Sequence, residues 1–87
     1  MLQALRTKAR ALAPVLQIEK GGVTPGVMNL IDRELEQKHL IKIKILSSAL
    51  PQKDARIAKQ AMVAAMASGT QSRLVMQTGN VAVLYRA

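Results

Sequence analysis

The sequence predicts an α/β domain of two layers, in which helices pack on a mixed four-stranded sheet. Apolar residues recur at helical spacing in three segments, and a run of isoleucines alternates with lysines as in a strand. Short connections that contain glycine or proline separate these segments. The predicted order is α-β-α-β-α-β-β. A chain of 87 residues has room for one hydrophobic core, so we expect residues 1–87 to form a single domain.

The first helix is predicted over residues 2–12 and the first strand over residues 15–18. Apolar side chains at helical spacing form one stripe along this helix. The stripe consists of Leu2, Leu5, Ala9 and Leu12. Pro14 ends the helix, because the residue before a proline is displaced from the α region.

The second helix is predicted over residues 25–38, after a loop that contains two glycines. Thr24 is a good N-cap, since its hydroxyl can accept a hydrogen bond from a helix amide. Pro25 suits the first helical position, where its missing N–H costs nothing. The apolar positions of the helix are Val27, Leu30, Ile31 and Leu35.

A second strand is predicted over residues 40–46, followed by a loop at residues 47–51. Isoleucines alternate with lysines in this strand, which places the two residue types on opposite faces of the sheet. One face carries Ile41, Ile43 and Ile45, and the other carries Lys42 and Lys44. We therefore expect one face of the sheet to be covered and the other to be at least partly in water.

The third helix is predicted over residues 52–68, with Gly69 as its C′ residue. Its expected apolar face consists of Ile57, Ala58, Ala61, Met62, Ala65 and Met66. Residues 73–77 and 81–85 are predicted strands, and the Thr-Gly-Asn connection between them fits an antiparallel hairpin. The strand–helix–strand spacing predicts parallel pairing with right-handed crossovers, closed by this antiparallel pair.

The chain is strongly basic. Its 13 lysines and arginines against 5 acidic residues give a net charge of +8. Acidic residues are absent from residues 1–18 and 55–87. A charge of this sign and size indicates a polyanionic partner, and nucleic acid is the first to consider. A basic surface without a ligand is the alternative.

Composition also excludes several kinds of site. Tyr85 is the only aromatic residue, so the chain lacks the two or three rings with which many RNA-binding sheets stack bases. Recognition would therefore rely on phosphate, sugar and shape. The chain has no cysteine, which suits a reducing, cytoplasmic location, and we expect no metal or cofactor. No apolar run approaches the roughly 20 residues of a membrane span, so we expect no membrane partner.

The strand–loop–helix segment at residues 18–26 is a candidate phosphate site. Bare amides at a helix start, backbone without a Cβ and an adjacent lysine suit a phosphate group. The candidate residues are Lys20, Gly21, Gly22 and Thr24. A tight turn that needs glycine for a positive φ is the alternative.

Two further basic groups are candidate RNA contacts. Arg6, Lys8 and Arg10 lie on a predicted helix that carries no acid. Lys42 and Lys44 share one face of the second strand and are expected to add a secondary contact. As alternatives, the first group only solvates the helix and the second only keeps the open sheet face soluble.

Several short motifs together resemble the CRM domain, and above all its stand-alone bacterial YhbY-like form. The motifs are Val15-x-x-Ile18-x-Lys20-x-Gly22-Val23-Thr24, Ile31 with Leu35, Leu40-Ile41-Lys42-Ile43-Lys44, and Val83-Leu84-Tyr85-Arg86. The resemblance covers essentially the whole chain. It implies a fold similar to the C-terminal domain of bacterial translation initiation factor three.

The resemblance also implies a function. Members of the family bind structured RNA, and the stand-alone bacterial forms are linked to precursors of the large ribosomal subunit. The family's loop is usually GxxG and falls by position on residues 19–22, so Glu19 stands where the first glycine is usual. We therefore expect a monomeric, non-catalytic protein that binds ribosomal RNA in large-subunit precursors and assists ribosome assembly.

Three other classes of function stay open. An enzyme would need convergent titratable groups, which one histidine, His39, and five scattered acids do not supply. We therefore expect a structural role for His39 and no small-molecule substrate. A protein-interaction adaptor would use Met62 and Met66 of the third helix. A general nucleic-acid-binding protein without a ribosomal role would bind duplex DNA as well as RNA.

Overall fold

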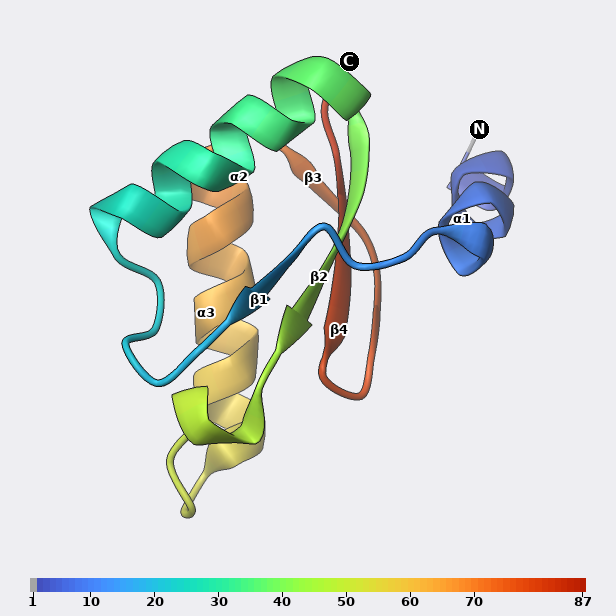
Figure 1. The fold of residues 1–87 in the computed structure, drawn as a ribbon. Coiled ribbons are helices and arrows are strands. Elements are labelled where there is room, and N and C mark those ends of the chain that lie inside the picture. The colour runs from blue at the N-terminus through green and yellow to red at the C-terminus, as the bar shows by residue number, and fades with distance from the viewer. Residues whose placement is uncertain (1) are drawn as a thin grey trace.

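Four strands form one mixed sheet in the order β1-β2-β4-β3 (Figure 1). The structure is a computed structural model and describes residues 2–87. The elements are α1 (Leu2–Ala11), β1 (Leu16–Ile18), α2 (Pro25–Lys38), β2 (Leu40–Ile45), the short 3₁₀ helix η1 (Ser47–Ala49), α3 (Ala55–Gly69), β3 (Arg73–Thr78) and β4 (Val81–Tyr85). Every predicted helix and strand is present, with bounds within one helical turn of those expected.

The elements follow one another along the chain as predicted, but one strand pairing differs from the predicted one. β1 runs parallel to β2, with Leu16 opposite Ile43, as predicted. β4 is antiparallel to both β2 and β3, so the expected direct pairing of β2 with β3 is wrong. The reason is that β4 buries Ala82, Val83 and Leu84, which lie on both of its faces. A strand that is apolar on both faces belongs in the middle of a sheet, whereas half of the residues of β3 are exposed.

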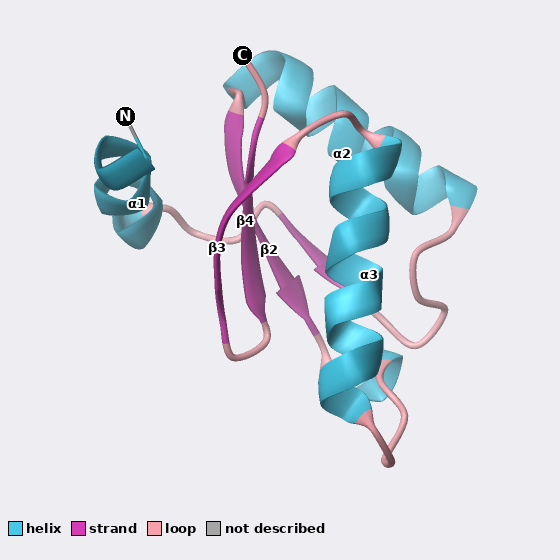
Figure 2. Cartoon of the chain, turned by 180° about the vertical axis from the view of Figure 1, so that it is seen from behind, coloured by secondary structure: helices cyan, strands magenta, loops and turns pink. Residues whose placement is uncertain are grey.

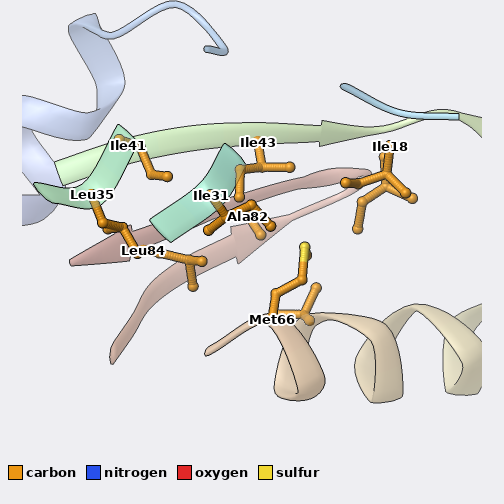
Figure 3. Packing of buried hydrophobic residues seen from close by; sticks show 10 residues of the cluster. Ile18, Ile31, Leu35, Ile41, Ile43, Met66, Ala82 and Leu84 are labelled. Carbon is orange, nitrogen blue, oxygen red and sulfur yellow. The ribbon is translucent and has the colours of Figure 1, made fainter. Parts of the chain in front are cut away.

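Helices α2 and α3 cover one face of the sheet (Figure 1). The three isoleucines of β2 are fully buried against these helices, as their alternation predicts. The buried cluster consists of Ile18, Ile31, Leu35, Ile41, Ile43, Ile45, Val63, Met66, Ala82 and Leu84. Figure 3 shows Met66 of α3 directed toward the side chains of the sheet. Each large aliphatic side chain stabilises the fold by roughly 1.5–3 kcal/mol, so this cluster fixes β1 and α2, the two elements that flank the glycine loop.

Helix α1 lies on the opposite face of the sheet (Figures 1 and 2). Ala9 is fully buried there against Val75 and Val83, with Leu5 and Tyr85 packed around them. α1 therefore adds a partial third layer to the two that the sequence predicts. The lysines of β2 alternate with its buried isoleucines and belong to this second face, which stays partly open as expected.

Helix α3 begins and ends later than predicted. Asp54 has a left-handed φ of 59°, so the residues before it cannot belong to the helix. At the other end Gly69 is still helical, and Gln71 adopts the left-handed φ of 56°. Thr70 takes the capping position in place of the predicted glycine, because its hydroxyl donates to the Met66 carbonyl at 2.6 Å.

The buried face of α3 is rotated from the predicted one. Val63 and Met66 are buried and Met62 is half-buried, but Ile57 is 66% exposed. The other predicted core positions that lie in water are Ala61 and Ala65. Alanine is the cause of this error, since it is a good helix former on any face and gives no polar signal.

Arg86 closes the end of the sheet opposite the glycine loop. Its guanidinium donates to the Asp32 carboxylate at 2.6 Å and to the Thr70 carbonyl at 2.8 Å. Its amide donates to the His39 carbonyl at 2.8 Å, and His39 Nδ1 lies 3.1 Å from the Arg86 carbonyl oxygen. His39 also ends α2 with a φ of 67°, so it has the structural role that the sequence predicts.

Candidate nucleic-acid interface

The glycine loop, residues 19–24, joins the end of β1 to α2. It opens with a turn in which the Gly22 amide donates to the Glu19 carbonyl at 2.8 Å. Gly22 has a φ of 71°, which a residue with a Cβ rarely adopts. Gly21 is outside that region, and a Cβ added there would meet no atom within 4 Å. The turn therefore requires Gly22 and makes no demand on Gly21.

The start of α2 follows the predicted capping pattern. Thr24 Oγ1 accepts a hydrogen bond from the Val27 amide at 3.2 Å, and Pro25 occupies the first turn. The Thr24 carbonyl accepts from the Met28 amide at 2.9 Å. Pro25 has no N–H, and the amides of Val27 and Met28 are bonded to Thr24. In the first turn of α2, only the amide of Gly26 therefore lacks a partner within residues 2–87. The helix start thus offers an anion fewer donors than the sequence suggests.

The turn before the helix supplies further donors. Lys20 and Gly21 are exposed, and their amides have no hydrogen-bond partner in residues 2–87. Lys20 makes no ion pair in this part of the chain. The Glu19 side chain is exposed as well, so water and salt screen its repulsion of an anion. Free amides, an ammonium group and the positive end of the helix dipole together suit a phosphate.

The basic residues of α1 lie on different sides of that helix. Arg10 lines a groove between α1 and the sheet together with Lys42. Lys8 lines a second groove together with Lys38. Arg6 is half-buried, and its Nε lies 3.5 Å from a backbone carbonyl oxygen of β3, so it helps to hold α1 on the sheet. Of the three predicted contacts on α1, Lys8 and Arg10 therefore line grooves, whereas the guanidinium of Arg6 already lies near the backbone of β3.

The lysines of strand β2 lie between α1 and the glycine loop. Lys44 is exposed, two residues beyond Lys42, and lies opposite Gln17 in the register with β1. The glycine loop begins two residues after Gln17. The loop and α1 lie on opposite sides of the molecule (Figures 1 and 2). The predicted site residues consequently form a track across the sheet rather than one cluster.

Most of the positive charge on this chain is uncompensated. Lys38 pairs with Glu34 at 2.7 Å, and Arg86 pairs with Asp32 at 2.6 Å. Of the 13 lysines and arginines, the other 11 make no ion pair within residues 2–87. Among these, Arg56 and Lys59 line a groove at the start of α3 and are not among the predicted contacts. The apolar pattern of that helix masks them, and the available signal was the absence of acids from residues 55–87.

Other kinds of site find little support in the described part of the chain. Residues 2–87 contain no group of three or more His, Cys, Asp or Glu side chains that could hold a metal ion. None of the helices within those residues is long and apolar enough to cross a membrane. Tyr85 is half-buried beside α1, where it packs against the buried cluster of Ala9, Val75 and Val83, so its ring is partly covered by the protein.

The sequence model of the CRS1/YhbY (CRM) domain matches residues 1–86. The chain belongs to the CRM domain family. This CRM domain is 37% identical over 82 residues to the probable RNA-binding protein YqeI of Bacillus subtilis, which covers 94% of the chain and 79% of YqeI. It is 32% identical over 84 residues to an RNA-binding protein of Haemophilus influenzae, with 97% of the chain and 79% of that relative covered.

A solved structure confirms the fold of this CRM domain. The solution structure of the hypothetical protein SAV1595 from Staphylococcus aureus superposes with a TM-score of 0.76 at 29% identity. The match covers 99% of this chain and 83% of the other. The predicted family and the predicted α/β class are therefore both confirmed.

Proposed function

We propose that this CRM domain is a non-catalytic RNA-binding protein that binds ribosomal RNA in precursors of the large ribosomal subunit and assists ribosome assembly. The glycine loop carries the proposal, because Lys20 is exposed there and the amides of Lys20 and Gly21 have no hydrogen-bond partner within residues 2–87. The relatives named probable RNA-binding protein and RNA-binding protein support RNA as the partner. The resemblance to the YhbY-like form supports the ribosomal role.

The proposed contacts are to the RNA backbone. The amides of Gly21 and Gly26 and the ammonium of Lys20 hold a phosphate at the loop. Arg10, Lys42 and Lys44 continue the contact across the open face of the sheet. Since the chain has a single aromatic ring and that ring is half-buried, phosphate, sugar and shape determine affinity. The protein acts as a cytoplasmic monomer, without a cofactor and without chemistry on the RNA.

Reversal of the charge at Lys20 tests the role of the loop. Lys20 is exposed and makes no ion pair within residues 2–87, so Lys20→Glu should keep the melting temperature of the wild type. Loss of a phosphate contact should weaken binding to a large-subunit ribosomal RNA transcript about tenfold, and to other structured RNAs by a similar factor. Fluorescence anisotropy with labelled RNA measures this change.

Arg33→Glu is the matched control for this experiment. Arg33 is also exposed and makes no ion pair within residues 2–87, but it lies on α2 beside the Asp32–Arg86 pair, at the opposite end of the sheet. The reversal changes the net charge by the same amount. If the two variants lose the same affinity, only net charge matters, and the loop is a turn without a phosphate site.

A general nucleic-acid-binding role is the second candidate. The uncompensated charge of 11 basic residues favours it, because phosphate contacts alone do not distinguish RNA from DNA. The adaptor hypothesis has less support, since Met66 is fully buried and Met62 is half-buried against the core.

A further inference from the structure

The basic groove at the start of α3 lies at the same end of the sheet as the glycine loop. The Leu46 amide donates to the Ile18 carbonyl at 2.9 Å, and the Ile45 amide donates to the Asn80 carbonyl at 2.7 Å. These bonds hold three segments side by side where they leave the sheet: the glycine loop, the η1 segment and the tip of the β3–β4 hairpin. Figure 1 shows η1 and the first turn of α3 beside each other at this end of the molecule.

The groove runs between the η1 segment and α3 and has a volume of about 330 Å³. Its lining consists of Ser47, Leu50, Pro51, Gln52, Ala55, Arg56, Lys59 and Asn80. Lys59 Nζ donates to Asn80 Oδ1 at 3.2 Å, which directs the ammonium group toward the hairpin tip. An ammonium has three donors, so two remain for a ligand. Arg56 is exposed and makes no hydrogen bond to the protein within residues 2–87.

The charge in this groove is positive and uncompensated. Neither Arg56 nor Lys59 pairs with an acid within residues 2–87. Asp54 is the acid nearest in sequence, and its exposed side chain is absent from the lining of the groove. The serine hydroxyl and the side-chain amides of the lining add neutral hydrogen-bonding groups. This combination matches a phosphodiester and the adjoining sugar hydroxyls, which need cations and neutral donors together.

We propose that the groove formed by Arg56, Lys59 and Ser47 binds the phosphodiester backbone of the RNA whose neighbouring phosphate lies at the glycine loop. This inference rests on the proposed function. The glycine loop follows β1 and the η1 segment follows β2, and these two strands are neighbours in the sheet, so both sites lie at the same end of the sheet. One folded RNA can therefore contact both sites. The protein then contacts the RNA at two places, the glycine loop and the start of α3.

The double variant Arg56→Gln/Lys59→Gln tests the groove. With a labelled RNA hairpin as the probe, it should bind at least tenfold more weakly than the wild type at low salt. The plot of log affinity against log salt concentration should lose about two units of slope, because each phosphate contact contributes about one. Anisotropy titrations over a range of KCl concentrations give both quantities.

Two further variants keep the test decisive. Arg56→Gln alone disturbs no hydrogen bond of the described chain, so its loss of about one unit of slope should come without a change in melting temperature. Arg33→Gln/Arg73→Gln removes the same charge from exposed positions near the other end of the sheet and should change the slope less.

The outcomes separate the groove from the loop. If Lys20→Glu weakens binding but the groove variants match the Arg33→Gln/Arg73→Gln control, the groove is not an RNA site and the proposed function stands. If the wild type does not bind the hairpin or ribosomal RNA, the proposed function fails. Should the groove variants keep full RNA affinity but lose binding of labelled poly-glutamate, the groove binds acidic protein segments and the RNA assignment is overturned.

Discussion

The two neighbouring glycines of the loop differ in backbone conformation. Gly22 holds a left-handed φ of 71°, whereas Gly21 has neither a positive φ nor a nearby atom. A left-handed conformation costs a residue with a Cβ about 1–2 kcal/mol. Gly22→Ala should therefore lower the free energy of unfolding by that amount, and Gly21→Ala should leave it unchanged or raise it slightly. Urea denaturation followed by circular dichroism measures both.

The same two variants separate a turn from a phosphate site. A methyl group at position 21 obstructs close approach of a phosphate to the backbone, so Gly21→Ala should lose RNA affinity at full stability. Full affinity in Gly21→Ala would mean that no phosphate approaches there. Equal losses of stability in the two variants would contradict the left-handed conformation of Gly22.

Residues that act locally could be predicted from the sequence, and residues that act at long range could not. Thr24 caps the helix that begins immediately after it, so a few neighbouring residues reveal its role. Arg86 binds Asp32 across 54 positions of the chain. In the sequence Asp32 is only a charge on the outer face of a helix. Its pairing depends on how α2 packs against the end of the sheet, which no local pattern encodes.

At the scale of elements, α2 is the helix with the clearest boundary signals. Thr24 Oγ1 accepts from the Val27 amide, and that amide has no other partner within residues 2–87. Thr24→Ala should therefore lower the free energy of unfolding by about 1 kcal/mol, while Thr24→Ser should keep nearly all of it. Thermal unfolding of the two variants compares them. A loss as large in the serine variant would show that the threonine methyl, not its hydroxyl, stabilises this end of α2.

The contrast between α2 and α3 shows where element prediction fails. α2 has a cap, a proline and alternating polar and apolar residues, and its predicted bounds are those observed. α3 begins after a left-handed Asp54 that makes no side-chain cap, and alanines occupy both its faces. Without a polar contrast, the sequence cannot orient the helix. The same ambiguity hides Arg56 and Lys59, since a helix interpreted as core gives no reason to examine its charged positions.

At the scale of the whole molecule, the order of strands depends on competition for the buried positions. β4 lies in the interior of the sheet because it is apolar on both faces, and β3 lies at the edge. Sequence spacing alone favours direct pairing of strands that a helix connects. The same packing decides that the predicted basic residues spread along a track. The sequence predicts which basic residues are candidate contacts, but the distances between them depend on where α1 packs on the sheet.

The net positive charge of the molecule determines how its affinity for RNA depends on salt concentration. If Lys20, Arg10, Lys42 and Lys44 each neutralise a phosphate, and the groove at α3 adds up to two more, the slope of log affinity against log salt concentration should be about −3 to −5. Affinity should then fall by roughly two to three orders of magnitude between 50 and 200 mM salt. A flat dependence would contradict recognition through the backbone.

Duplex DNA titrated at the same salt concentrations separates the two candidate functions, because equal affinity for DNA and ribosomal RNA follows from charge alone. A preference for the folded RNA requires that the spacing between the loop, the sheet and the groove matches the shape of that RNA.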